Sequence, residues 1–380
     1  MSHVSADLPE TRYARHDGWH EKHDCSEREP KIGAVLMAAT ISAGYPRTML
    51  DFAVSKGASR QQLLERCRLT EGELADQDQH VPVERYLALI EEAAALTGEP
   101  AIALQFGEAV RMQDISIVGL ICEACETTLE VGAQLNRYAS LVADEGNADP
   151  ATLMRAQWTD EGVWIEFPSD LVANNARIAE AELARLVWNA RVMFANSPEF
   201  QQLDWPRAVH FRHAEPSYRA EYDRIFRAPI VFGSDCNALL VDPRFPQLKQ
   251  PPVNRYVFGL LSERADALLK RAQNARTVRG RVESLLMQRM HTGEVGIDAI
   301  AAQLAMSRGA LYRKLKLEGV TFDRLLEELR QKLALHYLDG GKVSVSQTAY
   351  LLGFSDPAAF SRAFKRRTGS SPRRRAGRGH

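Results

Sequence analysis

Hydrophobic residues recur every three or four positions along much of the chain, and this spacing predicts α-helices. Helix boundaries can also be recognised between residues 31 and about 142. Ser59 can cap one helix, and Pro82 lies in the first turn of another helix that ends at Gly98. This part of the chain is therefore predicted to be helical.

Three short runs farther along are rich in β-branched and aromatic residues, which predicts strands. They cover residues 163–167, 208–212 and 230–232. Residues 176–194 form a long apolar stretch without helix breakers and predict a helix. Another helix is expected from residue 256 to about 272, after several prolines. The region from 31 to 272 is thus predicted to be an α+β domain.

The C-terminal part of the chain contains an internal repeat, and each copy has the pattern of a helix, a tight turn and a second helix. An offset of 48 residues relates the pairs Ala301/Ala349, Leu304/Leu352 and Ser307/Ser355. After one inserted residue the offset is 49, as in the pairs Leu311/Phe360, Arg313/Arg362 and Leu315/Phe364. Such a pattern is typical of helix-turn-helix units.

The turns and helix ends of the two copies carry suitable residues. The expected helix caps are Ser307, Asp356 with Pro357 after it, and Ser344 with Gln347 as a capping box. Gly353 stands where the turn needs a positive φ angle. Ala305 takes this place in the first copy, so some backbone strain is expected there.

Apolar residues between the copies predict one long helix whose apolar face packs against both. They are Phe322, Leu325, Leu326, Leu329, Leu333 and Tyr337. A single copy could be a plain αα-hairpin, but two copies with matching turns and caps favour an all-α domain with two helix-turn-helix units joined by a long helix. In such a unit the second helix enters the major groove of DNA by its N-terminal residues.

Charge is distributed unevenly along the 380 residues, although the formal net charge is only −1. The segment from Thr277 to the end has 19 Lys+Arg and 9 Asp+Glu, a net charge of +10. Residues 1–276 have 29 basic and 40 acidic residues, a net charge of −11. The basic segment has the electrostatics of a nucleic-acid binder, and the length predicts two or three domains.

Residues 1–30 are polar and charged and are predicted to form a disordered leader. His16, His20 and His23 have a spacing that could align metal ligands on a helix, but a solvated tail is the favoured interpretation. The sequence has neither a signal segment nor an apolar run long enough to span a membrane. The five cysteines are therefore interpreted as reduced thiols of a cytoplasmic protein, and Cys122 and Cys125 as core residues. Neither a metal nor a cofactor is predicted.

Residues 278–376 resemble the DNA-binding domain of the AraC/XylS family of bacterial transcription regulators. The resemblance is strongest over residues 351–366, which begin Leu351-Leu352-Gly353-Phe354-Ser355-Asp356-Pro357, and it continues through Thr368-Gly369 and Ser371-Pro372. The first copy matches the family pattern at Met306-Ser307, Leu311, Arg313, Leu315 and Glu318-Gly319. It departs from the pattern at Gly309, where the family often has a large or basic residue. Thr348 and Arg367 replace a common Ile or Val and a common Trp.

Residues 31–272 more loosely resemble the arabinose-binding-like domain of one AraC subgroup. The similarity lies in the helical start and in residues 211–216, Tyr222, Phe226, 229–233 and 237–239. It implies a domain that senses a small-molecule effector, whose identity the sequence does not give. It also implies a homodimer, with RNA polymerase as a further partner.

The expected organisation follows from these observations. It is a leader over 1–30, an effector-binding and dimerisation domain over 31–272, a linker over 273–277, a DNA-binding domain over 278–376 and a tail over 377–380.

Helix geometry predicts the residues that face DNA. The pairs Leu311/Leu315 and Phe360/Phe364 have i, i+4 spacing and must face the core. The residues left for DNA are Arg308, Gly309, Tyr312, Arg313 and Lys316 in the first copy, and Pro357, Ala358, Ser361, Arg362 and Lys365 in the second. Arginine can read guanine through two hydrogen bonds, alanine can pack on the thymine methyl, and hydroxyl groups suit phosphates or bases. Arg362 has a salt bridge or phosphate contact as its alternative role, and Arg373-Arg374-Arg375 with Arg378 are expected to give nonspecific attraction.

The charge distribution and the repeat favour a ligand-controlled DNA-binding transcription regulator, and two other functions are alternatives to it. A cysteine-based alkyl-DNA repair protein needs an activated thiolate and a four-cysteine zinc site, and the sequence offers only one CxxC pair. A constitutive DNA-binding protein with a structural N-terminal domain is the other alternative. No common catalytic motif is present, so catalytic residues are not predicted and the protein is expected not to be an enzyme.

Overall fold

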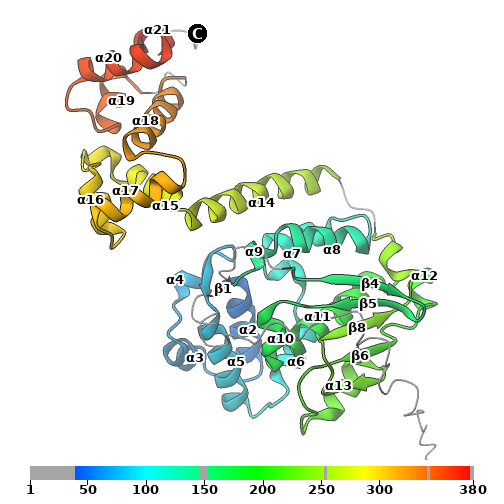
Figure 1. Cartoon of the computed structure of the whole chain (residues 1–380). Helices are drawn as coiled ribbons and strands as arrows, with labels where there is room; N and C mark the ends of the chain where they lie inside the picture. The colour runs from blue at the N-terminus through cyan, green and yellow to red at the C-terminus, as the bar shows by residue number, and fades with distance from the viewer. Residues whose placement is uncertain (1–38, 146–151, 252–254, 340–342, 377–380) are drawn as a thin grey trace, which may run out of the picture. The chain divides into compact units, whose positions relative to one another are not determined.

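The computed structural model describes residues 39–145, 152–251, 255–339 and 343–376. The predicted leader and the tail with Arg378 lie outside the described residues, as do the N-terminal histidines and Cys25. The chain divides into two compact units, Met1–Leu269 and Lys270–His380, which are described separately (Figure 1).

The first part of unit 1 is mainly helical. Its helices are α2 (Gly44–Ser55), α3 (Arg60–Cys67), α4 (Glu71–Leu74), α5 (Val83–Thr97), α6 (Ile102–Ala109), the 3-10 turn η1 (Met112–Asp114), α7 (Ile117–Glu123), α8 (Thr128–Arg137) and α9 (Ala139–Val142). The Ser59 side chain accepts a hydrogen bond from the backbone of Gln62, and Gly98 ends α5 in the left-handed conformation, so these two predicted boundaries are confirmed. Pro82, predicted in the first turn of α5, is instead the residue just before the helix and the last residue of a short strand.

The expectation that residues 31 to about 142 are helical was wrong at two short strands, and a third strand follows this stretch. These are β1 (Thr40–Ser42), β2 (His80–Pro82) and β3 (Ala143–Asp144), and β1 pairs antiparallel with both others. Strands of two or three residues are too short to leave an alternating pattern in the sequence. The sheet joins segments that lie far apart along the chain.

A five-stranded sheet occupies the second part of unit 1. Its order is β4 (Arg155–Thr159), β5 (Gly162–Glu166), β8 (Ala238–Val241), β6 (Ala208–His210) and β7 (Ile230–Val231), and only the β6–β7 pair is parallel. The three predicted strands correspond to β5, β6 and β7. The accompanying helices are α10 (Asp170–Asn174), α11 (Ala176–Met193), α12 (Pro198–Gln201) and α13 (Arg219–Phe226).

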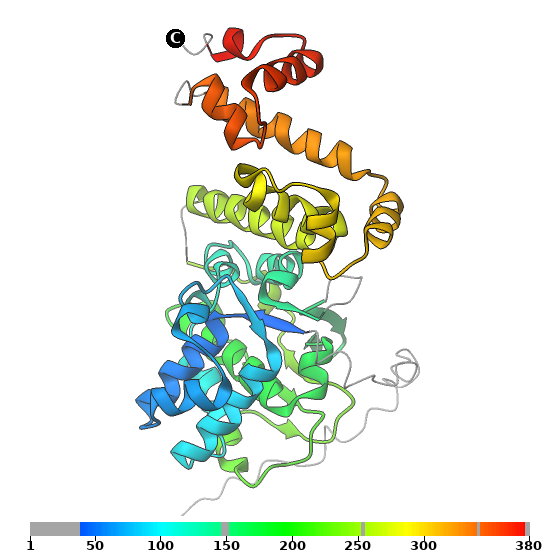
Figure 2. The same cartoon turned by 90° about the vertical axis from the view of Figure 1, so that its left-hand side faces the viewer.

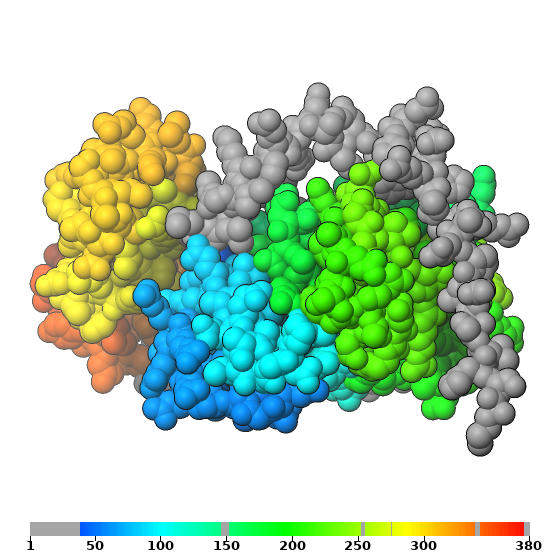
Figure 3. Space-filling model, turned by 90° about the horizontal axis from the view of Figure 1, so that it is seen from below, coloured from blue at the N-terminus to red at the C-terminus, as the bar shows by residue number. Residues whose placement is uncertain are grey.

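Helix α11 is the predicted helix 176–194, and it connects the two parts of unit 1. Figure 1 shows it between the N-terminal helices and the five-stranded sheet. Its side chains approach α6 so closely that a β-carbon at Gly107 would contact the backbone of Ala181 and lie 2.8 Å from the β-carbon of Ala184. From below, the blue-to-cyan helical part and the green sheet-bearing part form one continuous surface (Figure 3).

All secondary-structure elements described in unit 2 are helices. Its elements are α15 (Val278–Arg289), the 3-10 turn η3 (Met290–Thr292), α16 (Ile297–Gln303), α17 (Arg308–Leu317), α18 (Phe322–Asp339), α19 (Val345–Leu351), α20 (Pro357–Thr368) and α21 (Pro372–Ala376). The long helix α18 lies between the first copy in yellow and the second in orange and red (Figure 2). One hydrophobic core contains buried residues from both copies and from α18, which agrees with the predicted connecting helix.

Helix α14 (Arg255–Arg276) extends beyond the helix predicted over 256–272. Residues 273–276, predicted as linker, are helical, and Thr277 caps α15 by accepting a hydrogen bond from the backbone of Gly280. A β-carbon at Gly280 would overlap the carbonyl group of Asn274. The end of α14 therefore packs tightly on the start of α15.

Candidate nucleic-acid interface and ligand pocket

The first candidate recognition helix is α17. Ser307 caps it by accepting a hydrogen bond from the backbone nitrogen of Ala310 at 3.2 Å. Leu311 and Leu315 are buried in the core of unit 2. All five residues predicted to face DNA on this helix are exposed. They are Arg308, Gly309, Tyr312, Arg313 and Lys316. The structure thus presents them together on the outer face of one helix.

The turn before each second helix contains a residue in the left-handed conformation. Ala305 has φ 54° and Gly353 has φ 70°. The expected strain at Ala305 is present, because the left-handed conformation costs a residue with a β-carbon about 1–2 kcal/mol relative to the right-handed one. At Gly353 a β-carbon would also lie 2.6 Å from the carbonyl oxygen of Met290. Glycine is therefore required more strictly in the second turn than in the first.

The second candidate recognition helix is α20. The carboxylate of Asp356 accepts hydrogen bonds from the backbone nitrogens of Ala358 and Ala359 at 2.9 and 3.1 Å, with Pro357 as the first helical residue. Phe360 and Phe364 are buried. The predicted DNA-facing residues Ala358, Arg362 and Lys365 are exposed, whereas Pro357 and Ser361 are half-buried. Ser361 donates its hydroxyl proton to the carbonyl oxygen of Pro357 at 2.9 Å, which leaves its oxygen free to accept.

The arginines on these helices are weakly held by protein contacts. Arg308 forms an ion pair of 3.1 Å with Asp298, and both side chains are exposed. The Arg362–Asp356 distance of 4.0 Å is at the limit of an ion pair, and the Arg362 side chain is 73% exposed. Exposed pairs of this kind contribute about 0–1 kcal/mol. Among the described residues Arg313 has no ion-pair or hydrogen-bond partner. These guanidinium groups are therefore available to an anionic ligand such as DNA.

Three polar residues support the recognition helices through contacts that the sequence analysis did not predict. Arg330 on α18 donates hydrogen bonds to the carbonyl oxygens of Leu352 and Gly353 at 3.0 and 3.4 Å. Its guanidinium lies 4.5 Å from the centre of the Phe354 ring, and burial lowers its pKa from the ordinary value. This side chain fastens the second turn to the connecting helix.

Glu318 and Arg367 make the other two supporting contacts. The Glu318 carboxylate accepts hydrogen bonds from the backbone nitrogens of Val278 and Arg279 at 2.9 and 2.7 Å, and so caps α15. Arg367 forms a 3.2 Å ion pair with Glu327 on α18. Only the fold reveals these contacts, because each joins residues from different helices.

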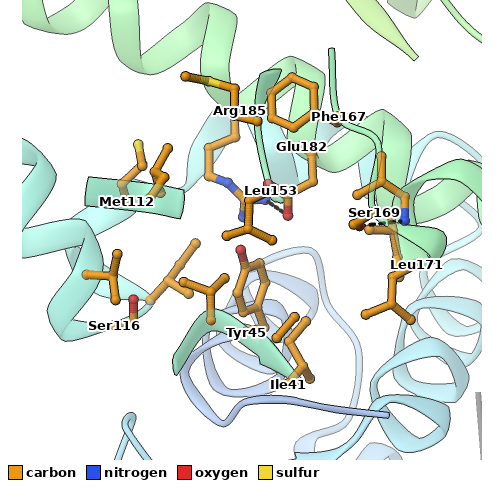
Figure 4. Close-up of a pocket in the computed structure, with 18 of the residues that line it drawn as sticks. Ile41, Tyr45, Met112, Ser116, Leu153, Phe167, Ser169, Leu171, Glu182 and Arg185 are labelled. Carbon is orange, nitrogen blue, oxygen red and sulfur yellow. Dashed lines mark hydrogen bonds and ion pairs between the residues drawn. The ribbon is translucent and has the colours of Figure 1, made fainter. Parts of the chain in front are cut away.

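Unit 1 contains a cavity of about 90 Å³ between its helical part and its sheet-bearing part (Figure 4). Since one water needs roughly 10–15 Å³, the cavity can hold several waters or a small organic molecule. Most of the lining is apolar. The residues labelled in Figure 4 are Ile41, Tyr45, Met112, Ser116, Leu153, Phe167, Ser169, Leu171, Glu182 and Arg185.

Arg185 and Glu182 are the charged residues of the lining, and both lie on α11. The Arg185 side chain is 4% exposed and forms an ion pair with the Glu182 carboxylate. Burial opposes the charge of Arg185, but Glu182 and the neighbouring Tyr45 and Tyr86 hold its pKa above the ordinary value. Burial, with Glu182 adding to it, also raises the pKa of Tyr45, so its hydroxyl is neutral. The cavity thus holds a permanent cation beside an apolar wall.

Cysteine chemistry and metal binding find little support in the described residues. Cys122 and Cys125 are free and buried, and burial raises the pKa of Cys125 to about 12 and that of Cys122 well above its usual range. Such thiols remain protonated and poorly nucleophilic. No group of three or more metal-binding side chains occurs among the residues that the structure describes. No helix in the same residues is long and apolar enough to cross a membrane.

Comparisons with protein families match both units. A family described as the arabinose-binding domain of AraC transcription regulators, N-terminal, matches residues 57–250. A helix-turn-helix domain family matches residues 300–376, which include both candidate recognition helices.

Individual relatives are similar over different parts of the chain. The ornithine utilization regulator of Pseudomonas aeruginosa is 25% identical over 346 residues, which are 88% of this chain and 96% of that protein. The transcriptional regulator VirS of Mycobacterium tuberculosis is 30% identical over 174 residues, 44% of this chain and 48% of that protein. The transcriptional activator RhaS of Escherichia coli is 44% identical over 81 residues, 21% of this chain and 29% of that protein.

Proposed function

The chain belongs to the AraC family of transcription regulators, and from this premise we propose how its two units divide the work. Unit 2 reads DNA with the N-terminal halves of α17 and α20, and the cavity of unit 1 binds the small molecule that controls this reading. The protein acts as a cytoplasmic homodimer joined through unit 1, contacts RNA polymerase and has no enzymatic activity.

One observation carries the DNA-binding part of the proposal. Both recognition helices are fixed through their apolar sides to a single core, while Arg313 and Arg362 stand exposed on their outer faces. A helix whose apolar side is fixed in the core can present an arginine on its outer side to base edges in the major groove. Because the helix is already held in place, binding DNA orders few other side chains. Phosphate contacts by Lys316 and Lys365 would then set the position of each helix on the duplex.

Mobility-shift and footprinting measurements on the full chain test this proposal. We expect a protected site with two contacted major-groove segments, and weaker binding for Arg313→Ala and Arg362→Ala. Arg324→Ala is the matched control, because Arg324 is an exposed arginine of the same unit that pairs with Glu328 on α18. Equal losses in all three variants would contradict recognition by α17 and α20.

The division into two units has its own test. A fragment covering residues 270–380 should fold and bind DNA, because it contains the whole core of unit 2. An unfolded fragment, or one without affinity for DNA at low salt, would contradict independent function of this unit. Light scattering on the full chain, alone and bound to DNA, tests the homodimer. A protein that stays strictly monomeric in both states would exclude it.

A further inference from the structure

We propose that the cavity of unit 1 takes a small organic acid, with the ligand carboxylate on Arg185 and an apolar body against the cavity wall. This inference rests on the proposed role of the cavity as the effector site and names the chemical class of the effector.

The guanidinium of Arg185 is the first reason. It is almost completely buried, and its Nη2 forms the ion pair with Glu182, yet Nη1 has no hydrogen-bond partner among the described residues. The group is flanked by the Tyr45 ring, whose centre lies 4.9 Å away, and by the carboxylate of Glu182 (Figure 4). A guanidinium has five donors in a planar fork that matches a carboxylate. A buried fork with unused donors at a cavity wall therefore favours an anionic ligand.

Glu182 explains how the cavity tolerates this cation. It lies one turn before Arg185 on α11, and its side chain is 21% exposed, whereas that of Arg185 is 4% exposed. The carboxylate neutralises Arg185 but keeps access to water. A ligand carboxylate on the same guanidinium would repel Glu182, because two anions would share one cation. We infer an exchange in which Glu182 turns toward water as the ligand anion takes its place.

The rest of the lining selects the body of the ligand. Met112, Leu135, Leu153, Phe167 and Leu171 present apolar side chains. Burying several hydroxyl groups of a sugar against these side chains would leave hydrogen-bonding groups without partners.

The serine hydroxyls of the lining already take part in hydrogen bonds within the protein. Ser116 and Ser169 accept hydrogen bonds from the backbone nitrogens of Gly119 and Val172 at 3.4 and 3.3 Å, and so cap α7 and α10. Since the rest of the lining is mostly apolar, an aliphatic or aromatic chain fits the wall better than a polyhydroxy ligand.

Isothermal titration of the full chain with matched compounds tests the carboxylate. The probes are hexanoate and 3-phenylpropionate, the amide and the amine of each skeleton, and the amino acids norleucine and phenylalanine. We expect at least one acid to bind at least about tenfold more tightly than its amide, its amine and its amino acid, as for a bidentate charged contact. Acids that bind no better than their amides would overturn the proposal, and so would binding restricted to the amino acids.

Three substitutions on α11 test the exchange. Glu182→Gln removes the competing anion and should tighten binding of the acid several-fold. Arg185→Lys keeps the charge but loses the fork, and should weaken binding. Arg191→Lys is the matched control, because Arg191 donates to the carbonyl oxygens of Ile225 and Phe226 and does not line the cavity. Weaker binding of the acid to Glu182→Gln would contradict the exchange, even if Arg185→Lys were to unfold.

A further variant separates this inference from the effector role of the cavity. Leu153→Trp should fill the cavity and abolish both acid binding and any effect of the acid on DNA binding. If a neutral compound binds the wild-type cavity and changes DNA binding while acids do not, the effector role stands and the organic acid is refuted. If the filled cavity leaves every effector response intact, the effector role itself is refuted.

Discussion

The guanidinium of Arg313 lies over Gly309, one turn earlier in the first recognition helix. A β-carbon at position 309 would be 3.8 Å from Nη1 of Arg313. Glycine therefore leaves the start of α17 bare and gives the arginine room to lie along the helix toward its N-terminus, the end that enters the major groove. The absence of a large residue at position 309 is thus compensated by space for Arg313.

Gly309→Ala should stabilise the protein without changing its DNA preference. The added methyl group makes only an ordinary contact with Arg313. Alanine in a helix interior is favoured over glycine by about 0.8–1.0 kcal/mol, and less is expected near the first turn. Urea denaturation of the two proteins measures the change, and a mobility-shift competition measures the preference. A large residue such as Leu at the same position should instead displace Arg313 and alter the preference, and unchanged binding by Gly309→Leu would show that this space has no role.

Arg313→Ala should cost about 1–3 kcal/mol of DNA-binding free energy and relax sequence specificity at one base pair, if Arg313 is bidentate to guanine. If it touches only phosphate, affinity should fall evenly over all sequences and the slope of the salt dependence should shrink by about one. We expect base readout, because Arg313 is exposed and has no partner among the described residues. Selection on randomised sites with both proteins decides between these outcomes, and identical sequence preferences would exclude base readout. The same comparison applies to Arg362.

Arg330→Met should destabilise unit 2. The substitution removes the hydrogen bonds to Leu352 and Gly353 and leaves these carbonyl oxygens without that partner. The expected loss is about 1–3 kcal/mol. Denaturation of the 270–380 fragment measures it, with Arg324→Ala as the control for loss of an exposed arginine. A variant as stable as the control would mean that the second turn does not depend on α18.

Much of unit 2 could be predicted from the sequence, because its helix caps and apolar stripes depend on residues that lie close together along the chain. Ser307, Asp356 and the Ser344–Gln347 capping box act within a few residues of their own position, and all form the predicted hydrogen bonds. The long helix was predictable because its apolar stripe has a clear helical period. Contacts such as Arg330 with Leu352 depend instead on how the helices pack.

The cavity of unit 1 could not be predicted in the same way. Glu182 and Arg185 have the i, i+3 spacing of a common surface ion pair, and only the fold buries the arginine beneath Tyr45, which is distant in sequence. The segments that surround the pair, from β1, η1 and α10, meet through tertiary contacts alone. An arginine in a long apolar helix is therefore a signal of a site only when its burial is known.

The stability of unit 1 should rise with pH between about 4 and 6.5 because of His210. This side chain packs on Trp164, with ring centres 4.6 Å apart, and one ring nitrogen lies 3.1 Å from the Ser234 hydroxyl. Burial lowers its pKa to about 4. The unfolded chain therefore binds a proton between pH 6.5 and 4 that the folded chain does not, so acidification favours unfolding.

A pKa shift of this size contributes at most about 3 kcal/mol to the free energy of unfolding at neutral pH. This contribution is lost once the pH falls below about 4. Since other groups also titrate in acid, the test is a comparison of denaturation curves for wild type and His210→Gln from pH 4 to 7.5. The variant lacks the titrating ring and should show a shallower dependence of its unfolding free energy on pH, even if it is less stable at neutral pH. Equal slopes in the two proteins would mean that the pKa of His210 is the same in the folded and the unfolded chain, which would contradict the prediction.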